Sequence, residues 1–203
     1  MAEKNSAASE RSWLCVTFEK PGPQNTGRTL EIAAKRADEL GIRHIVVATT
    51  SGKTGLLAAP VFKGKNLVIV THSTGFSAPD VQELNPAVRR KMEATGAKVL
   101  TCQHAFGGVG RAVRKKLATY ELDEIIAFTL RTFGQGTKVA IEISLMAADA
   151  GLIPTGELCI AIGGTNGGAD TAILLRPANA QTFFDLRIIE VLAKPRLEGG
   201  LSP

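Results

Sequence analysis

One short segment combines the residue types that hold a phosphate group. The apolar run at residues 45–48 is typical of a buried strand, and it ends abruptly in hydroxyl groups, a glycine and a lysine. Small apolar residues that favour a helix follow from Gly55. Backbone N–H groups at a helix start, hydroxyl donors and a lysine can converge on one anion. We therefore predict a phosphate-binding turn made of Thr49, Thr50, Ser51, Gly52, Lys53 and Thr54.

This turn lacks the spacing of a nucleotide-hydrolysing P-loop. That motif needs a glycine five residues before Gly52, and Val47 occupies this position inside the predicted strand. ATP hydrolysis is therefore not implied. On residue types alone, a phosphate-binding turn and a Ser/Thr turn that only caps the following helix explain the segment equally well.

The rest of the chain alternates between predicted strands and helices. Strands are expected at residues 12–18, 43–48, 66–70, 98–101, 158–162 and 171–175, with a late antiparallel edge strand at 184–192. Helices are expected at 28–40, from 55 onward, at 86–95, at 111–133 with a break near Tyr120, and at 137–150. This alternation predicts an α/β fold with three layers (α/β/α) and a mainly parallel sheet.

We expect residues 12–193 to form this single domain. Residues 1–11 are polar, without the apolar stretch of a secretory signal, and are expected to be a disordered lead. Residues 194–203 are expected to be a tail.

Ligands of such sheets bind beyond the carboxyl ends of the parallel strands. Each of the first five predicted strands is followed by a loop that is polar, glycine-bearing or both, so all five loops are expected at one rim. Besides the phosphate turn, we predict that ligand-binding residues at this rim include Asn25, Thr26, His72, Ser73, Thr74, Gly75, Phe76, His104, Phe106, Gly107, Gly108, Gly163, Gly164, Thr165, Asn166 and Gly167.

The two rim histidines have several possible roles. His72 and His104 could bind phosphate, carry a proton or ligate a metal, and an ordinary loop hydrogen bond is the favoured alternative. A Cys-x-His spacing at residues 102–104 is too short for a zinc site, so no metal is predicted. His44 lies at the far end of its strand and is expected to be structural. No Ser-His-Asp or Cys-His arrangement follows from the spacing.

Two acidic residues near these loops could act together as a general acid and a general base. Glu142 and Asp149 are seven residues apart and share a helix face. The favoured alternative is that Lys138 and Glu142 form an i,i+4 ion pair on the surface of that helix.

Composition limits the partners and the compartment. The net charge of +5 suits an anionic small ligand, and aromatic residues make up only 5% of the chain, which does not suit base stacking. The basic clusters at residues 89–91 and 111–116 are interpreted as solvated helix faces, so no nucleic-acid partner is expected. Three cysteines without close spacing indicate reduced thiols in a cytoplasmic protein, and no apolar run is long enough for a membrane partner.

The phosphate turn resembles a known family motif. Thr-x-Ser-Gly-x-Thr after an apolar strand is similar to the effector-phosphate loop in the C-terminal domain of pyruvate kinase. Thr49, Ser51, Gly52 and Thr54 match this motif, with Lys53 where the family often has a basic residue. The similarity extends over about residues 26–70. The glycine-rich segment 163–168 and the Asn25-Thr26 start resemble a stand-alone archaeal and bacterial family of proteins like this domain, over most of the chain.

The resemblance implies the domain's fold and a phosphate-bearing ligand, and the stand-alone family implies flavin mononucleotide (FMN) or a similar nucleotide. Nothing resembles the catalytic barrel of pyruvate kinase, which usually takes ~250 residues, so pyruvate kinase activity is not implied. We expect binding of a phosphorylated small molecule. An enzyme that acts on a phosphorylated metabolite or nucleotide through a rim histidine, and a regulatory or structural homo-oligomer with an effector site, remain as alternatives.

Overall fold

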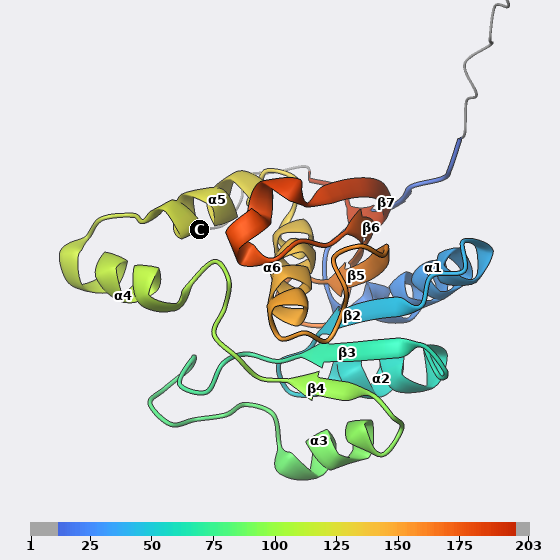
Figure 1. Cartoon of the computed structure of the whole chain (residues 1–203), viewed down its shortest axis with the longest axis horizontal. Coiled ribbons are helices and arrows are strands. Elements are labelled where there is room, and N and C mark those ends of the chain that lie inside the picture. Colours follow the sequence, from blue (N-terminus) through green and yellow to red (C-terminus); the bar gives the residue numbers. More distant parts are fainter. Residues whose placement is uncertain (1–11, 198–203) are drawn as a thin grey trace, which may run out of the picture.

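The computed structural model describes residues 12–197 of the 203-residue chain. Seven strands form one sheet in the order β1-β7-β6-β5-β2-β3-β4 (Figure 1). β6 is antiparallel to β5 and β7, and the other neighbouring pairs are parallel. The strands are β1 (Val16–Phe18), β2 (His44–Ala48), β3 (Asn66–Val70), β4 (Lys98–Leu100), β5 (Cys159–Gly163), β6 (Thr171–Arg176) and β7 (Arg187–Pro195).

Helices cover both faces of the sheet. Those of one face are α1 (Thr26–Glu39), α2 (Lys53–Val61) and α3 (Pro86–Glu93). The other face is covered by α6 (Gln135–Asp149), and α5 (Leu122–Arg131) packs on α6 while α4 (Gly108–Leu117) packs on α5. Two short 3-10 turns, η1 (Pro23–Asn25) and η2 (Ala180–Asp185), complete the chain. The predicted three-layer α/β fold is confirmed.

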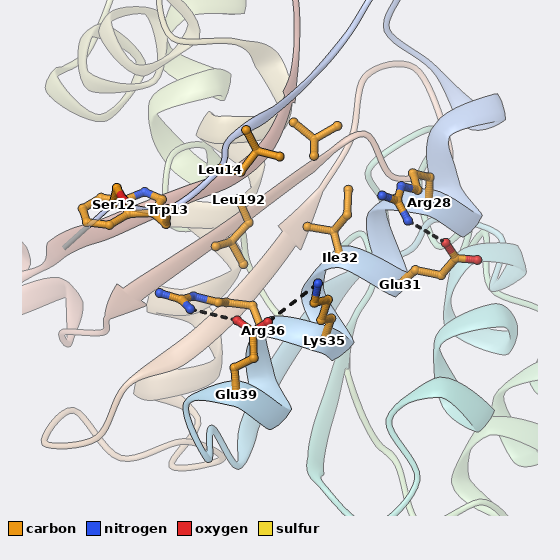
Figure 2. Close-up of a pocket in the computed structure, with 11 residues that line it drawn as sticks. Ser12, Trp13, Leu14, Arg28, Glu31, Ile32, Lys35, Arg36, Glu39 and Leu192 are labelled. Atoms are coloured by element: carbon orange, nitrogen blue, oxygen red, sulfur yellow. Dashed lines mark hydrogen bonds and ion pairs between the residues drawn. The ribbon is translucent and has the colours of Figure 1, made fainter.

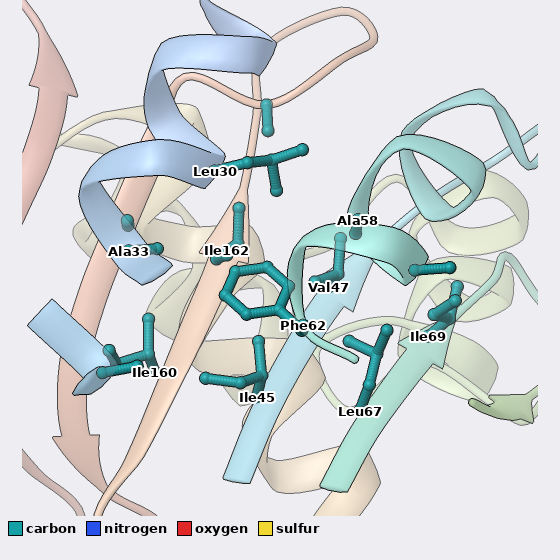
Figure 3. Close-up of a cluster of buried hydrophobic side chains, with 14 of the residues drawn as sticks. Leu30, Ala33, Ile45, Val47, Ala58, Phe62, Leu67, Ile69, Ile160 and Ile162 are labelled. Atoms are coloured by element: carbon teal, nitrogen blue, oxygen red, sulfur yellow. The ribbon is translucent and has the colours of Figure 1, made fainter. Parts of the chain in front are cut away.

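The larger core lies between the sheet and the first two helices (Figure 3). Phe62, which directly follows α2, is 1% exposed and lies among Ile45 of β2, Leu67 of β3 and Ile160 of β5. Full burial of one such side chain is worth about 1.5–3 kcal/mol. This core holds the start of α2, and therefore the predicted phosphate turn, against the central strands.

The C-terminal strand differs from the prediction. β7 is antiparallel to β6 as expected, but it lies between β6 and β1 and is not at an edge. Phe184 belongs to η2 and not to a strand. Lys194 and Pro195, expected in the tail, pair with β1. The two ends of a chain can pair wherever the fold brings them together, and local periodicity does not report such a contact.

Several helix boundaries also differ from the prediction. α1 begins at Thr26, two residues earlier than expected, and α6 begins at Gln135. The predicted break near Tyr120 is confirmed, because α4 ends at Leu117 and Ala118 adopts a φ of 55°. Within residues 12–197, no helix is both long and apolar enough to cross a lipid bilayer. The predicted lead at residues 1–11 lies outside the described residues.

Candidate functional site at the carboxyl rim

The strand directions bring the five predicted loops to one rim. β1, β2, β3, β4 and β5 all run in the same direction, so the five loops that follow them start at the same end of the sheet. The arrowheads of β3 and β4 point toward this rim, at the left of Figure 1. Because β6 runs the other way, its first residue also lies there.

The phosphate turn divides into a buried and an exposed half. Thr49 is 6% exposed, and its hydroxyl accepts hydrogen bonds from the N–H groups of Gly52 (3.1 Å) and Gly55 (3.4 Å). Thr49 therefore orders the turn from inside. Ser51 and Lys53 are exposed beside the first turn of α2, whereas Thr54 is buried. The first N–H groups of a helix have no intrahelical acceptor. Because Thr49 already accepts those of Gly52 and Gly55, the N–H groups of Lys53 and Thr54 are the ones left for a ligand.

Three rings gather next to this turn. The ring centroids of His72 and Phe76 are 4.1 Å apart, those of Phe76 and His104 are 4.9 Å apart, and those of the two histidines are 5.4 Å apart. The guanidinium carbon of Arg111 lies 4.8 Å from the Phe76 centroid. Both histidines and Phe76 come from loops that follow β3 and β4, as the rim prediction requires.

His72 connects the ring cluster with the phosphate turn. Its Nδ1 lies 2.7 Å from Oε2 of Glu83, and its Nε2 lies 3.4 Å from Oγ1 of Thr50. A hydroxyl, an imidazole and a carboxylate are thus connected in one chain. Sequence reasoning missed Glu83, because it lies in an irregular loop eleven residues after His72 and no fixed spacing marks it.

His104 faces a buried ion pair on α6. Its Nδ1 lies 3.7 Å from Oε2 of Glu142, which also pairs with Nζ of Lys138. The other carboxylate oxygen of Glu142 accepts the backbone N–H of Phe106 at 3.0 Å. Among the described residues, Nε2 of His104 is buried without a hydrogen-bond partner.

The predicted i,i+4 ion pair between Lys138 and Glu142 is confirmed, but its expected location on the surface is wrong. Each residue is 3% exposed, because α5 and the loop before α4 cover this side of α6. Burial by itself raises the pKa of Glu142, but His104 and then Lys138 outweigh that effect and lower it to about 2. Burial lowers the pKa of Lys138, and the Glu142 carboxylate opposes that shift.

Comparison with known proteins identifies the family. A family model for the alpha/beta domain of pyruvate kinase matches residues 28–175, which is most of the chain. The chain belongs to the pyruvate kinase alpha/beta domain family. The matched residues run from α1 to β6, so they include the phosphate turn, the ring cluster and the glycine-rich loop.

Solved structures similar to this pyruvate kinase alpha/beta domain include two of Cryptosporidium parvum pyruvate kinase. One is 15% identical, with a TM-score of 0.41, and the match covers 75% of this chain and 23% of that chain. Another, in complex with ADP, is also 15% identical, with a TM-score of 0.38 and coverages of 86% and 25%. The present chain thus spans about a quarter of these enzymes.

Close packing explains several glycines at the end of β5 and in the loop that follows it. A Cβ on Gly163 would lie 2.4 Å from the carbonyl oxygen of Gly136 at the start of α6. A Cβ on Gly168, whose φ is +67°, would lie 2.4 Å from Cα of Pro23. On Gly164 it would lie 2.3 Å from the Gly168 carbonyl oxygen. These glycines let the chain fit between η1 and α6.

The polar groups of this loop are largely engaged with the protein. Asp170, which is fully buried, accepts hydrogen bonds from the N–H groups of Gly22 (3.0 Å) and Thr165 (3.1 Å). The Thr26 hydroxyl accepts the N–H of Ala169 at 3.0 Å, and Asn25 donates its side-chain amide to a nearby carbonyl. Neither side chain caps α1, and the exposed Asn166 and Gly167 remain for a ligand.

The remaining predicted residues lie in the two outer loops. Ser73, Thr74 and Gly75 precede Phe76, and Thr74 and Gly75 are exposed. Phe106 is buried between Lys138 and the ring of Phe183, so it packs under the loop and does not face the rim. Gly107 and Gly108 lie at the start of α4. His44 binds Asn66 and Glu157 at the opposite end of the sheet, which confirms its structural role.

The hollows described for this domain lie away from the rim. A groove of about 300 Å³ runs between residues 12–14 and α1, as Figure 2 shows, with Trp13 and Leu14 on one side and Lys35 and Arg36 on the other. A second hollow of about 210 Å³ lies at the opposite end of the sheet, near Gly64. Within residues 12–197, no three His, Cys, Asp or Glu side chains are grouped to hold a metal ion.

Proposed function

We propose that this protein binds a phosphate-bearing small molecule at the carboxyl rim, with the phosphate on residues 51–54. The observation that carries the proposal is the exposure of Ser51 and Lys53 at the start of α2, above a turn that Thr49 orders from inside. The Ser51 hydroxyl, the Lys53 ammonium group and the N–H groups of Lys53 and Thr54 lie within four consecutive residues, so one phosphate can contact them together. The positive end of the helix dipole adds to their attraction for an anion.

The ring cluster is suited to the rest of such a ligand. Thr50 connects the turn with His72, and Phe76, which is 36% exposed, lies beside His72. A planar ring could stack here while its phosphate reaches the turn. FMN has one phosphate and one planar ring, and the resemblance to the stand-alone family makes it the first ligand to test.

Isothermal titration calorimetry with FMN and with a sugar bisphosphate tests the proposal. The double variant Ser51→Ala/Thr54→Ala should weaken binding of the preferred compound by at least about 100-fold, since it removes two hydrogen bonds to a charged group, each worth roughly 1.5–3 kcal/mol. Thr95→Ala is a matched control, because this hydroxyl lies at the other end of the sheet and bonds only to the Met92 carbonyl.

Two results would separate the parts of this proposal. Equal affinity in the double variant and the wild type would place the phosphate elsewhere. If the purified protein is colourless, does not bind FMN and has a melting temperature that rises with a sugar bisphosphate, FMN is rejected as the ligand. The proposed phosphate site at residues 51–54 would still stand.

A further inference from the structure

One hydroxyl of the phosphate turn precedes residues 51–54 and contacts an imidazole. Thr50 lies between the buried Thr49 and the exposed Ser51, and its Oγ1 faces Nε2 of His72. On the far side of the imidazole, Glu83 holds Nδ1 at 2.7 Å. Hydroxyl, imidazole and carboxylate in this order are the arrangement of an activated nucleophile, its general base and the group that orients the base.

We propose that Thr50 is a nucleophilic hydroxyl that accepts a phosphoryl group, with His72 as general base and Glu83 as positioning residue. The phosphoryl donor is a phosphoester held by residues 51–54, so this part of the inference rests on the proposed function. The activation of Thr50 itself depends only on the three side chains.

The proposed step balances within these residues. Oγ1 of Thr50 forms a bond to phosphorus while the bond from phosphorus to the leaving oxygen breaks. The hydroxyl proton moves to Nε2 of His72 and then to the departing oxygen. The products are an alcohol and a phosphorylated Thr50.

Three features of the site favour this chemistry. First, a carboxylate on Nδ1 keeps a proton on that nitrogen and leaves Nε2 as the acceptor that faces Thr50. Second, Phe76 packs against the imidazole and limits its rotation. Third, the N–H groups at the start of α2 directly follow Thr50, where they can stabilise negative charge on the phosphoryl oxygens. The 3.4 Å contact between Thr50 and His72 is long, as is common in ligand-free catalytic sites.

His104 is not an equivalent base for this hydroxyl. Its Nδ1 also faces a carboxylate, that of Glu142, but its side chain is 12% exposed against 30% for His72. Its Nε2 is buried, and Thr50 contacts His72 instead. The structure therefore assigns the role of general base to His72 and not to His104, although sequence analysis gave both histidines the same possible roles.

A fluorophosphonate probe tests the assignment on the full chain. This neutral reagent phosphonylates activated hydroxyls: the oxygen bonds to phosphorus, fluoride leaves and the base takes the proton. We expect one adduct, which tandem mass spectrometry of the digested protein places on Thr50. Thr50→Val should abolish it and Thr50→Ser should retain it, while His72→Ala should slow it by at least about 100-fold. Thr95→Val, distant from the rim, should react like the wild type.

Chemical rescue distinguishes participation from loss of structure. Added imidazole should restore labelling of His72→Ala, and added formate should restore labelling of Glu83→Ala, while neither should affect Thr50→Val. An adduct only on Ser51 or on another residue, or labelling unaffected by His72→Ala, would overturn the proposal. So would the absence of any adduct on a folded protein.

The two proposals fail separately. The probe carries no anionic phosphate, so its reaction does not need the phosphate turn. Labelling of Thr50 without calorimetric binding of a phosphorylated compound would support the activated hydroxyl and reject the proposed ligand. Binding of such a compound without labelling of Thr50 would support the proposed ligand and reject the activated hydroxyl.

Discussion

At the scale of single residues, the most unusual feature is the charge buried beneath the ring cluster. Lys138 and Glu142 pair inside the protein, with His104 against the same carboxylate. Isolated buried charges are costly, so each partner depends on the other. The pair also fixes the loop before α4, because Glu142 accepts the N–H of Phe106. One buried ion pair thus holds in place the loop between β4 and α4, which forms part of the rim.

The lowered pKa of Glu142 predicts acid sensitivity. Its folded value of about 2 lies below its ordinary value of 4.5, so its contribution to stability is present above pH 4.5 and lost as the pH falls toward 2. The full contribution is about 3 kcal/mol. Urea unfolding at a series of pH values should therefore show a steep loss of free energy in this window, and Glu142→Gln should remove that part of the slope.

The same variant should be less stable at neutral pH by about 3 kcal/mol, because it leaves the Lys138 charge unpaired. The double variant Lys138→Met/Glu142→Leu removes both charges and should recover much of that loss. An unchanged acid slope in Glu142→Gln would contradict the stabilising role of the pair.

At the scale of elements, the start of α2 is held by close contacts with α3. Gly52 has a φ of +91°, and a Cβ there would lie 2.4 Å from a methyl carbon of Val88 and 2.7 Å from one of Leu84. At Gly55, a Cβ would lie 2.4 Å from the sulfur of Met92. The glycine of the phosphate turn therefore serves packing as well as conformation, and α3 determines where the turn lies.

Gly52→Ala should accordingly cost about 2–4 kcal/mol, from overpacking and from backbone strain together. Gly64→Ala is the matched control: its φ is +85°, but nothing lies within 4 Å of the added Cβ, so only strain of about 1–2 kcal/mol remains. Guanidinium unfolding measures both. Equal losses in the two variants would show that contact with α3 does not constrain the turn.

At the scale of the whole molecule, an ion pair between distant parts of the chain holds the C-terminal strand in the sheet. Arg36 of α1 holds Glu190 of β7 through two hydrogen bonds, of 2.7 and 2.6 Å. Glu190 is 7% exposed, so this pair is largely shielded from solvent. It anchors β7, and β7 in turn carries β1 at the edge.

Arg36→Met should weaken that side of the sheet by roughly 1.5–3 kcal/mol, the usual worth of hydrogen bonds to a charged group. Hydrogen exchange should accelerate in β7 and β1 and stay unchanged in β2 and β3. Arg28→Met is the control, because its ion pair with Glu31 is exposed and worth less than about 1 kcal/mol. Uniform acceleration across all strands would show that the sheet opens only as one unit.

The fold was largely predictable because its elements alternate and their periodicity is local. Gly41 and Gly96 end helices, and Asn85 caps α3 through a hydrogen bond to the N–H of Ala87, as residue types alone indicate. The place of β7 was not predictable. Its neighbours are set by contacts such as that between Arg36 and Glu190, which are far apart in the sequence.

The candidate site was predictable only as a set of loops. The strand ends place His72, Phe76 and His104 at one rim, but nothing in the spacing shows that Glu83 meets His72. Likewise, the i,i+4 rule pairs Lys138 with Glu142 without showing which face α5 covers. Both contacts depend on how a loop or helix folds back in space.

The groove in Figure 2 contains the chain's one tryptophan, Trp13, which is 49% exposed beside α1 at the β1 edge. The ring cluster lies at the opposite side of the sheet, over the loops that follow β3 and β4. Intrinsic tryptophan emission is therefore an optical signal of one side of the molecule alone. Tryptophan fluorescence of this protein should therefore respond to changes in the packing of residues 12–14 against α1, and binding at the rim should affect it chiefly when the bound molecule itself absorbs light.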